Sequence, residues 1–190
     1  MEIEPTDLQA DSPEPLFWGE EVFSLISDLA DQILSSGKLD DQMVVVGIAN
    51  GGIALSNLLR RLLERQTGLS FDFGIVEISF HRDDIGSHPI PIVAHPTDIP
   101  VSIDGKTLLL VDDVIASGRT VRAAINEIFD IGRPEKILFA ALLDRGGRKL
   151  PLRPDFLADQ IEISADQDLR VHIDEENPKG HKIEITRDEN

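Results

Sequence analysis

Two adjacent carboxylates stand where an apolar run gives way to a glycine-containing turn. Asp112 and Asp113 directly follow the segment TLLLV at 107–111, and the residues ASGRT at 116–120 come shortly afterwards. Neighbouring carboxylates repel each other, so this placement requires a favourable partner. The segment ASGRT supplies backbone N–H groups, two hydroxyls and the start of a predicted helix, whose positive dipole end suits a phosphate group.

Carboxylates are poor ligands for phosphate, so the two aspartates would face a different part of a ligand. Sugar hydroxyls donate hydrogen bonds to carboxylates, and a metal ion would also satisfy them. A ribose 5-phosphate offers the hydroxyls and the phosphate in one molecule. The structural alternative is that Asp112 and Asp113 only cap the turn and that Gly118 only permits it.

Alternating strands and helices are expected to position these residues. Apolar residues at helical spacing predict helices at about 22–33, 53–63 and 118–131. Short apolar runs predict strands at 43–48, 71–80, 107–111 and 136–143, with a long loop at 81–100. Further short strands near 156–163, 170–173 and 182–186 are expected to finish the same sheet. This order predicts an α/β fold with a mainly parallel, twisted sheet, in which ligands bind at the carboxyl ends of the strands.

Composition limits the classes of protein to which the chain can belong. It has 190 residues, of which 41% are hydrophobic, and this size and composition favour one soluble domain. Its net charge of −17 disfavours RNA binding. The first 41 residues carry eleven acidic residues and one basic residue, and residues 1–18 are expected to form a flexible acidic arm before a single domain at 19–190. Without a signal-like start or a long apolar run, we expect a cytoplasmic protein with no membrane partner. The absence of cysteine excludes disulfides and thiolate sites.

The thirteen residues LLLVDDVIASGRT at 108–120 resemble the phosphoribosyl-diphosphate (PRPP) signature of type I phosphoribosyltransferases. Four further segments resemble the PyrR family, the bifunctional pyrimidine attenuation regulators and uracil phosphoribosyltransferases: ISFHRDD at 78–84, DIP at 98–100, GRP at 132–134 and DRGGRKLPLRPDF at 144–156. The resemblance covers about residues 20–175. It implies a type I phosphoribosyltransferase fold with a small hood contributed by about residues 144–190.

The resemblance implies roles for residues in five places. Asp112 and Asp113 would bind the ribose hydroxyls of PRPP and, indirectly, a magnesium ion that arrives with the diphosphate. Arg82 would contact the diphosphate from a flexible loop. The 5-phosphate loop would consist of Ala116, Ser117, Gly118, Arg119 and Thr120. The pyrophosphate loop would consist of Ala49, Asn50, Gly51 and Gly52. The hood over the base would include Asp144, Arg145, Gly146 and Arg148.

Two positions depart from related families. The pyrophosphate loop has no lysine or arginine, so transfer is expected to be weak, and a plain turn between strand and helix is the alternative for ANGG at 49–52. Ala116 stands where 6-oxopurine transferases usually have an acid, which disfavours hypoxanthine and guanine. For Arg82 the alternative is a surface ion pair with Asp83 or Asp84, and for RGGRK at 145–149 it is a solvated basic corner.

Three functions follow from the resemblance. The first is transfer of the 5-phosphoribosyl group from PRPP to uracil, giving UMP and diphosphate. The second is an RNA-binding attenuator that senses UMP or PRPP, and the third is a catalytically weak relative that acts through a protein partner. A homodimer or higher homo-oligomer is also implied, and the apolar face of LLRRLLER at 58–65 would belong either to its interface or, the favoured alternative, to the core.

Overall fold

The computed structural model describes residues 15–49, 51–78, 97–164 and 166–187. Its helices are α1 (Glu20–Ser35), α2 (Gly52–Thr67) and α3 (Arg119–Ile131), with a 3-10 turn, η1, at Pro178–Gly180. Its strands are β1 (Pro15–Trp18), β2 (Val44–Ile48), β3 (Asp72–Val76), β4 (Thr107–Ile115), β5 (Lys136–Asp144), β6 (Phe156–Gln160), β7 (Gln167–His172) and β8 (Lys182–Arg187). Across these described ranges, no helix is long and apolar enough to cross a membrane.

Five strands form a parallel central sheet in the order β3-β2-β4-β5-β6. After β2 the chain moves outward to β3 and then returns to place β4 on the other side of β2. The strand order therefore reverses between β2 and β4, which is where open α/β sheets bind their ligands. The prediction of a mainly parallel α/β sheet is confirmed.

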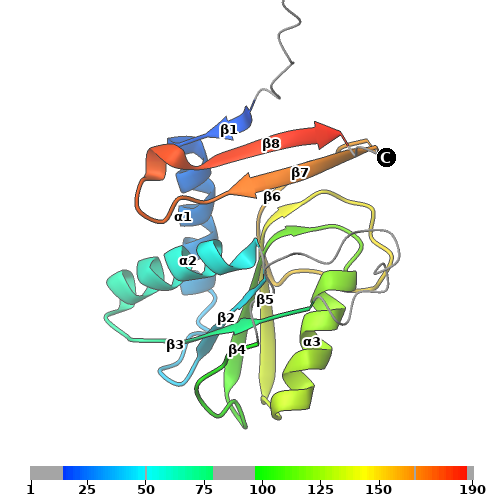
Figure 1. Ribbon diagram of the computed structural model, residues 1–190. Helices are drawn as coiled ribbons and strands as arrows, with labels where there is room; N and C mark the ends of the chain where they lie inside the picture. The colour runs from blue at the N-terminus through cyan, green and yellow to red at the C-terminus, as the bar shows by residue number, and fades with distance from the viewer. Residues whose placement is uncertain (1–14, 50, 79–96, 165, 188–190) are drawn as a thin grey trace, which may run out of the picture.

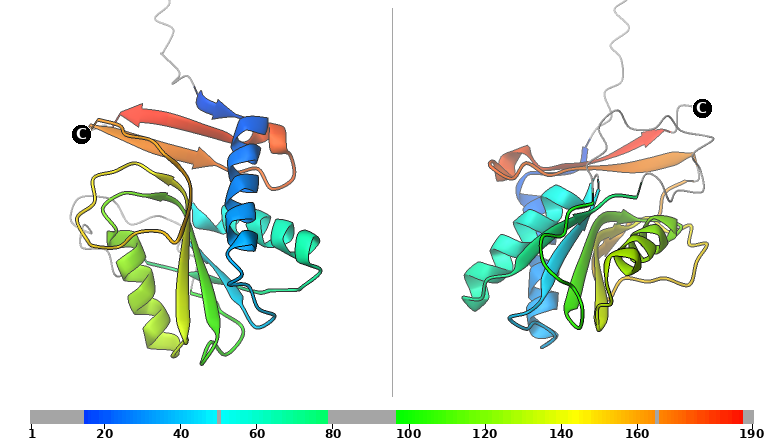
Figure 2. Two further views of the ribbon diagram at one scale, coloured as in Figure 1. Left: turned by 180° about the vertical axis from the view of Figure 1, so that it is seen from behind. Right: turned by 60° about the horizontal axis from the view of Figure 1, so that its bottom comes forward.

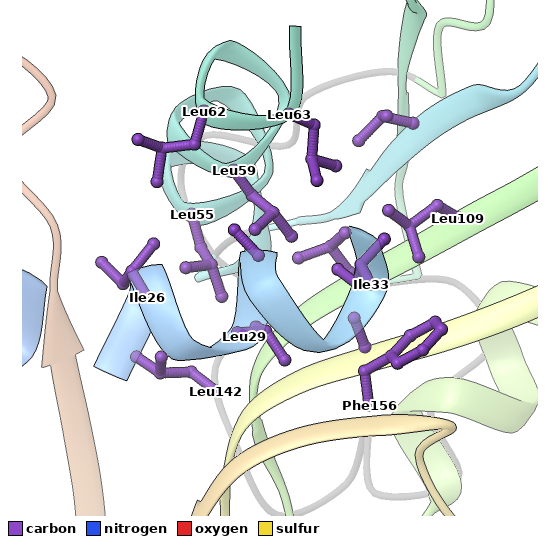
Figure 3. Packing of buried hydrophobic residues seen from close by; sticks show 14 of the residues in the cluster. Ile26, Leu29, Ile33, Leu55, Leu59, Leu62, Leu63, Leu109, Leu142 and Phe156 are labelled. Carbon is purple, nitrogen blue, oxygen red and sulfur yellow. The ribbon is translucent and has the colours of Figure 1, made fainter. Parts of the chain in front are cut away.

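Helices cover both faces of the central sheet, with α1 and α2 on one face and α3 on the other (Figure 1). Side chains of β2 alternate accordingly: Val45 packs in the cluster that contains α1 and α2, whereas Val44 and Val46 pack in the cluster that contains α3. Figure 3 shows α1 and α2 packed together, with Leu55 and Leu59 pointing from α2 toward α1. The three long helices begin and end within a few residues of their predicted bounds.

The apolar face of the segment at 58–65 belongs to the core. Leu59 and Leu63 are fully buried in the cluster between α1, α2 and the sheet, and Leu62 is buried beside them. Burial of a leucine side chain contributes about 1.5–3 kcal/mol to folding, so this face is already used within one chain. Of the two predictions for the segment, the core is confirmed.

β4 is longer than the apolar run from which it was predicted. The predicted strand ended at residue 111, but β4 continues through both aspartates to Ile115 and is paired with β5 on either side of Asp113. Its pairing with β2 stops at Val111. Asp112 and Asp113 therefore lie on a part of β4 that extends past β2, where one side of the strand is free to face a loop or a ligand.

The prediction that all later strands would finish one sheet is wrong. β6 joins the central sheet, but β7 and β8 form a separate antiparallel sheet in the order β1-β8-β7. β1 comes from residues 15–18, which the sequence assigned to the flexible arm; the rest of that arm lies outside the described residues. Figures 1 and 2 show this second sheet as its own layer, across one end of the central sheet.

Candidate functional site

The site lies at the reversal of strand order, where glycines allow the loop after β2 to approach β4. A β-carbon on Gly51 would have three atoms of the Asp113 carboxylate as its nearest neighbours, the farthest of them, Oδ1, at 2.6 Å. A β-carbon on Gly52 would lie 3.3 Å from the Cα of Asp112 and still closer to the carbonyl oxygen of Val111. Residues 51 and 52 are therefore glycine because β4 occupies the space of a side chain.

The two aspartates are held in an environment that disfavours their charges. Asp112 is only 5% exposed, and Asp113 is partly buried. Burial raises the pKa of Asp112 well above its usual value, and the neighbouring charge of Asp113 raises it further. Burial also raises the pKa of Asp113, against the lowering effect of hydrogen bonds from backbone N–H groups, including that of Val114 at 2.8 Å from Oδ1. Ligand hydroxyls or a cation would relieve this cost.

The loop between β4 and α3 has the form expected of an anion site. Gly118, at φ 87°, precedes the first residue of α3, and no acidic side chain lies in the first turn of that helix. The Ser117 hydroxyl accepts a hydrogen bond from the Arg119 N–H at 3.2 Å, and Thr120 lies in the first turn. First-turn N–H groups have no acceptor within their own helix, so together with the dipole they favour a phosphate.

The segment after β5 is fastened to that loop by its backbone. The N–H groups of Lys149 and Leu150 both donate to the Ser117 carbonyl, at 2.9 and 3.0 Å. The Arg148 guanidinium donates to the Ala116 carbonyl and pairs with Asp144 at 2.5 Å. The predicted hood residues thus lie beside the predicted 5-phosphate loop.

Arg145 connects the central sheet to the second sheet. Its N–H donates to the Ile115 carbonyl at 3.1 Å, while its Nη1 donates to the Gln167 carbonyl and to Asp168 Oδ1, both at 2.8 Å. Arg145 and Arg148 are both partly buried and paired, so the solvated basic corner does not describe them. Asp168 was not predicted as a site residue, because its local sequence does not indicate that β7 contacts the end of β4.

The structure brings together most of the residues predicted for the site. β4, the loop before α2, the loop before α3 and the segment 144–148 meet at one end of the central sheet (Figure 1). Ala49 is buried at the start of the pyrophosphate loop, where its N–H donates to the Val76 carbonyl at 3.0 Å. Asn50 and Arg82 lie outside the described residues, as does most of the predicted loop at 81–100.

The carboxylates of Asp112 and Asp113 are the hard oxygen ligands that magnesium prefers. Within the described ranges, no three histidine or acidic side chains gather closely enough to hold a metal ion by themselves. To hold a magnesium ion, the two aspartates would therefore need further oxygen ligands from a bound ligand or from water.

Comparison with known proteins identifies the class. The family model described as phosphoribosyl transferase domain matches residues 16–174. The hypoxanthine phosphoribosyltransferase of Trypanosoma cruzi superposes with a TM-score of 0.66 at 19% identity, covering 93% of this chain and 97% of that one. The hypoxanthine-guanine phosphoribosyltransferase of Leishmania tarentolae, solved with GMP, gives 0.66 at 17% identity over the same shares. The fold is that of the phosphoribosyltransferases.

Sequence relatives narrow the class further. The "Bifunctional protein PyrR" of Microcystis aeruginosa is 38% identical over 157 residues, which cover 82% of this chain and 88% of the relative. That of Streptomyces coelicolor is 36% identical over 170 residues, covering 89% and 88%. The chain belongs to the PyrR family of phosphoribosyltransferase-fold proteins.

Proposed function

We propose that the protein transfers the 5-phosphoribosyl group of PRPP to uracil, forming UMP and releasing diphosphate. The observation that carries the proposal is the contact between Asp113 on β4 and Gly51 before α2, next to the uncapped N-terminal loop of α3. One ligand that carries ribose hydroxyls, a 5-phosphate and a 1-diphosphate would match all three parts of this site. Membership of the PyrR family supports the same ligand.

Each part of the site would act by positioning and by electrostatics. Asp112 and Asp113 would accept hydrogen bonds from the ribose hydroxyls, which stabilises their buried charge and orients the anomeric carbon. The loop 116–120 would hold the 5-phosphate through backbone N–H groups and the hydroxyls of Ser117 and Thr120. A bound magnesium ion would neutralise charge on the diphosphate as it leaves. No side-chain nucleophile is needed.

The choice of a pyrimidine rests on the residues around the predicted hood. Ala116 presents no acid to a purine ring, and its carbonyl oxygen is already bonded to Arg148. Asp144 is also committed to Arg148, and its Oδ1 accepts the Gly146 N–H at 2.9 Å. The side chains of Asp144 and Arg148 are therefore already paired with each other, and uracil would be bound largely through backbone groups.

Parallel transfer assays with uracil, hypoxanthine and guanine test this proposal. The full chain is incubated with PRPP, magnesium and radiolabelled uracil, and UMP is separated from uracil; parallel reactions contain labelled hypoxanthine or guanine. We expect UMP from uracil and less than about one hundredth of that rate with the purines, the selectivity that unpaired polar groups impose. IMP or GMP formed faster than UMP would overturn the assignment. The rate itself tests whether a pyrophosphate loop without lysine or arginine makes transfer weak.

A second candidate is regulation by RNA binding, in which UMP or PRPP occupies the same site. Lys149 and Arg153 are exposed in the same segment, so they are the basic residues there that RNA phosphates could reach, whereas Arg145 and Arg148 are paired with Asp168 and Asp144. Binding to phosphates would weaken steeply with salt. Gel-shift titrations against a pyrimidine-operon leader at 50 and 200 mM salt, with and without UMP, measure the RNA affinity and its dependence on salt and on UMP.

Sedimentation in the same buffers tests whether the protein forms a homo-oligomer, as the family resemblance implies.

A further inference from the structure

The second sheet, formed by β1, β8 and β7, is attached to the central sheet by few contacts near the site. Leu169 of β7 is buried in the core cluster, and β7 runs against β4. Arg145 provides a polar attachment at this end, where it bonds Asp168 and the Gln167 carbonyl. Figure 1 shows β7 as the strand of this sheet that passes nearest the ends of β4 and β5.

Arg145 is itself fixed at both ends. Its backbone N–H donates to Ile115, the last residue of β4, and its side chain ends on β7. Asp168 is likewise fixed, because its Oδ1 also accepts the Leu169 N–H at 2.9 Å. The Arg145 side chain is 29% exposed and that of Asp168 is 47% exposed, so the pair is partly open to solvent. Its geometry is held by the further hydrogen bonds to the Gln167 carbonyl and from the Leu169 N–H.

The hydrogen bonds that shape the phosphate part of the site do not include this pair, although the charge of Asp168 also raises the pKa of Asp113. The loop before α3 is fastened by Lys149 and Leu150 N–H groups, and Asp113 packs against Gly51. The segment that begins at Arg145 is different, because it borders the second sheet and is the predicted hood over the base. Loss of this ion pair should therefore weaken binding of the base more than binding of PRPP.

We propose that Asp168 is a positioning residue for the base: by holding the Arg145 guanidinium it fixes the second sheet and the hood segment over the ends of β4 and β5. This inference rests on the proposed transferase function and deepens it. The effect of Asp168 on the base passes through Arg145, and the charge of Asp168 also acts on Asp113.

The chain offers a matched control for this proposal. Arg61 on α2 pairs with Glu175, in the connection between β7 and β8, at 2.5 Å. This second pair also joins an arginine of the main body to a carboxylate of the second-sheet region. Arg61 belongs to none of the binding loops, so Arg61→Gln removes one tie to the second-sheet region without altering the hood segment.

Steady-state kinetics of the full chain test the proposal. Asp168→Ala should raise KM for uracil about tenfold, as expected for a lost charge-assisted hydrogen bond. The kcat should stay within about twofold, and KM for PRPP should stay the same or fall, because the Asp168 charge no longer opposes ionisation of Asp113. Asp168→Glu should restore part of the loss, and Arg61→Gln should leave both KM values unchanged. Equal effects of Asp168→Ala and Arg61→Gln, or a change in KM for PRPP alone, would overturn it.

Binding measurements separate this inference from the proposed function. If the natural chain forms no UMP, titration calorimetry of UMP and of PRPP with magnesium replaces the kinetics. Asp168→Ala should then weaken UMP binding about tenfold without weakening PRPP binding, even though the proposed catalysis has failed. Equal affinities of the natural chain and Asp168→Ala for UMP, or no binding of either ligand by the natural chain, would overturn the positioning role.

Discussion

Asp113 occupies the space into which a side chain at Gly51 would project. The three atoms nearest to a β-carbon at residue 51 all belong to the Asp113 carboxylate. β4 and the loop after β2 therefore meet across the reversal of strand order, at the place where α/β sheets bind ligands. The contact also explains why residue 51 carries no basic side chain, since in this arrangement there is no room for one.

Replacement of Gly51 by alanine should damage both folding and ligand binding. Overpacking of this kind costs about 1–3 kcal/mol in the free energy of unfolding, and displacement of Asp113 should weaken PRPP binding by at least tenfold. Urea denaturation and calorimetry measure the two effects.

A double-mutant cycle identifies the cause of that loss. Asp113→Ala removes the atoms that the new methyl group meets, so Gly51→Ala should cost less free energy of unfolding in the Asp113→Ala background. If the cost is the same in both backgrounds, the contact with Asp113 is not what requires glycine.

Neutralising the aspartates should stabilise the protein while disabling it. The pKa of each group is raised in the fold, so the folded state binds more protons than the unfolded state, and stability falls as pH rises above about 4. At pH 7, Asp112→Asn and Asp113→Asn should each raise the free energy of unfolding, seen as a Tm higher by about 2–4 °C per kcal/mol. Turnover should fall at least about 100-fold. Lower Tm values for both variants would contradict the account.

Gly118→Ala tests the loop before α3. Gly118 lies at φ 87°, a backbone region that costs alanine about 1–2 kcal/mol. Gly37, at φ 64°, has no neighbour within 4 Å of its β-carbon position and lies after α1, so Gly37→Ala is the matched control. Both variants should lose similar stability by urea denaturation, and only Gly118→Ala should lose affinity for PRPP. Loss of affinity in both would show that backbone strain alone is responsible.

His181 should make the protein acid-sensitive. It is fully buried beside Phe23, and its Nδ1 accepts the Asp174 N–H at 3.1 Å. Burial lowers its pKa, opposed by the charge of Asp174, so its contribution to stability is complete above pH 6.5 and is lost as pH falls below that value.

Glutamine at residue 181 keeps an acceptor but cannot take up a proton. Between pH 7 and 5, His181→Gln should therefore show a smaller loss of unfolding free energy than the natural chain, by at most about 1.4 kcal/mol per pH unit. Identical pH dependence of His181→Gln and the natural chain in urea denaturation would refute the role of His181.

Periodicity was sufficient for the helices and for the existence of most strands. The apolar spacing from Val22 to Ile33 is a local property and appears as α1. Which sheet a strand joins depends on distant partners, and so β7 and β8 were assigned to the wrong sheet. β1 was not predicted, because PLFW follows a proline-rich acidic stretch and its strand pairing is with the distant β8.

For the site, residues within one segment were predictable and contacts between segments were not. The series from Asp112 to Thr120 carries its ligand chemistry in consecutive residues. The contact of Asp113 with Gly51 follows in outline from the parallel topology, but its closeness does not. Asp168 reaches Arg145 only because the second sheet folds back over the ends of β4 and β5, and no local pattern encodes that return.

The most direct test of the central claim is calorimetric titration of PRPP with magnesium into the natural chain and into Asp112→Asn/Asp113→Asn. We predict saturable binding to the natural chain and affinity at least 30-fold weaker for the double variant, with circular dichroism showing both folded. Equal affinity of the two proteins would mean that the paired aspartates do not bind the ribose and would contradict the account.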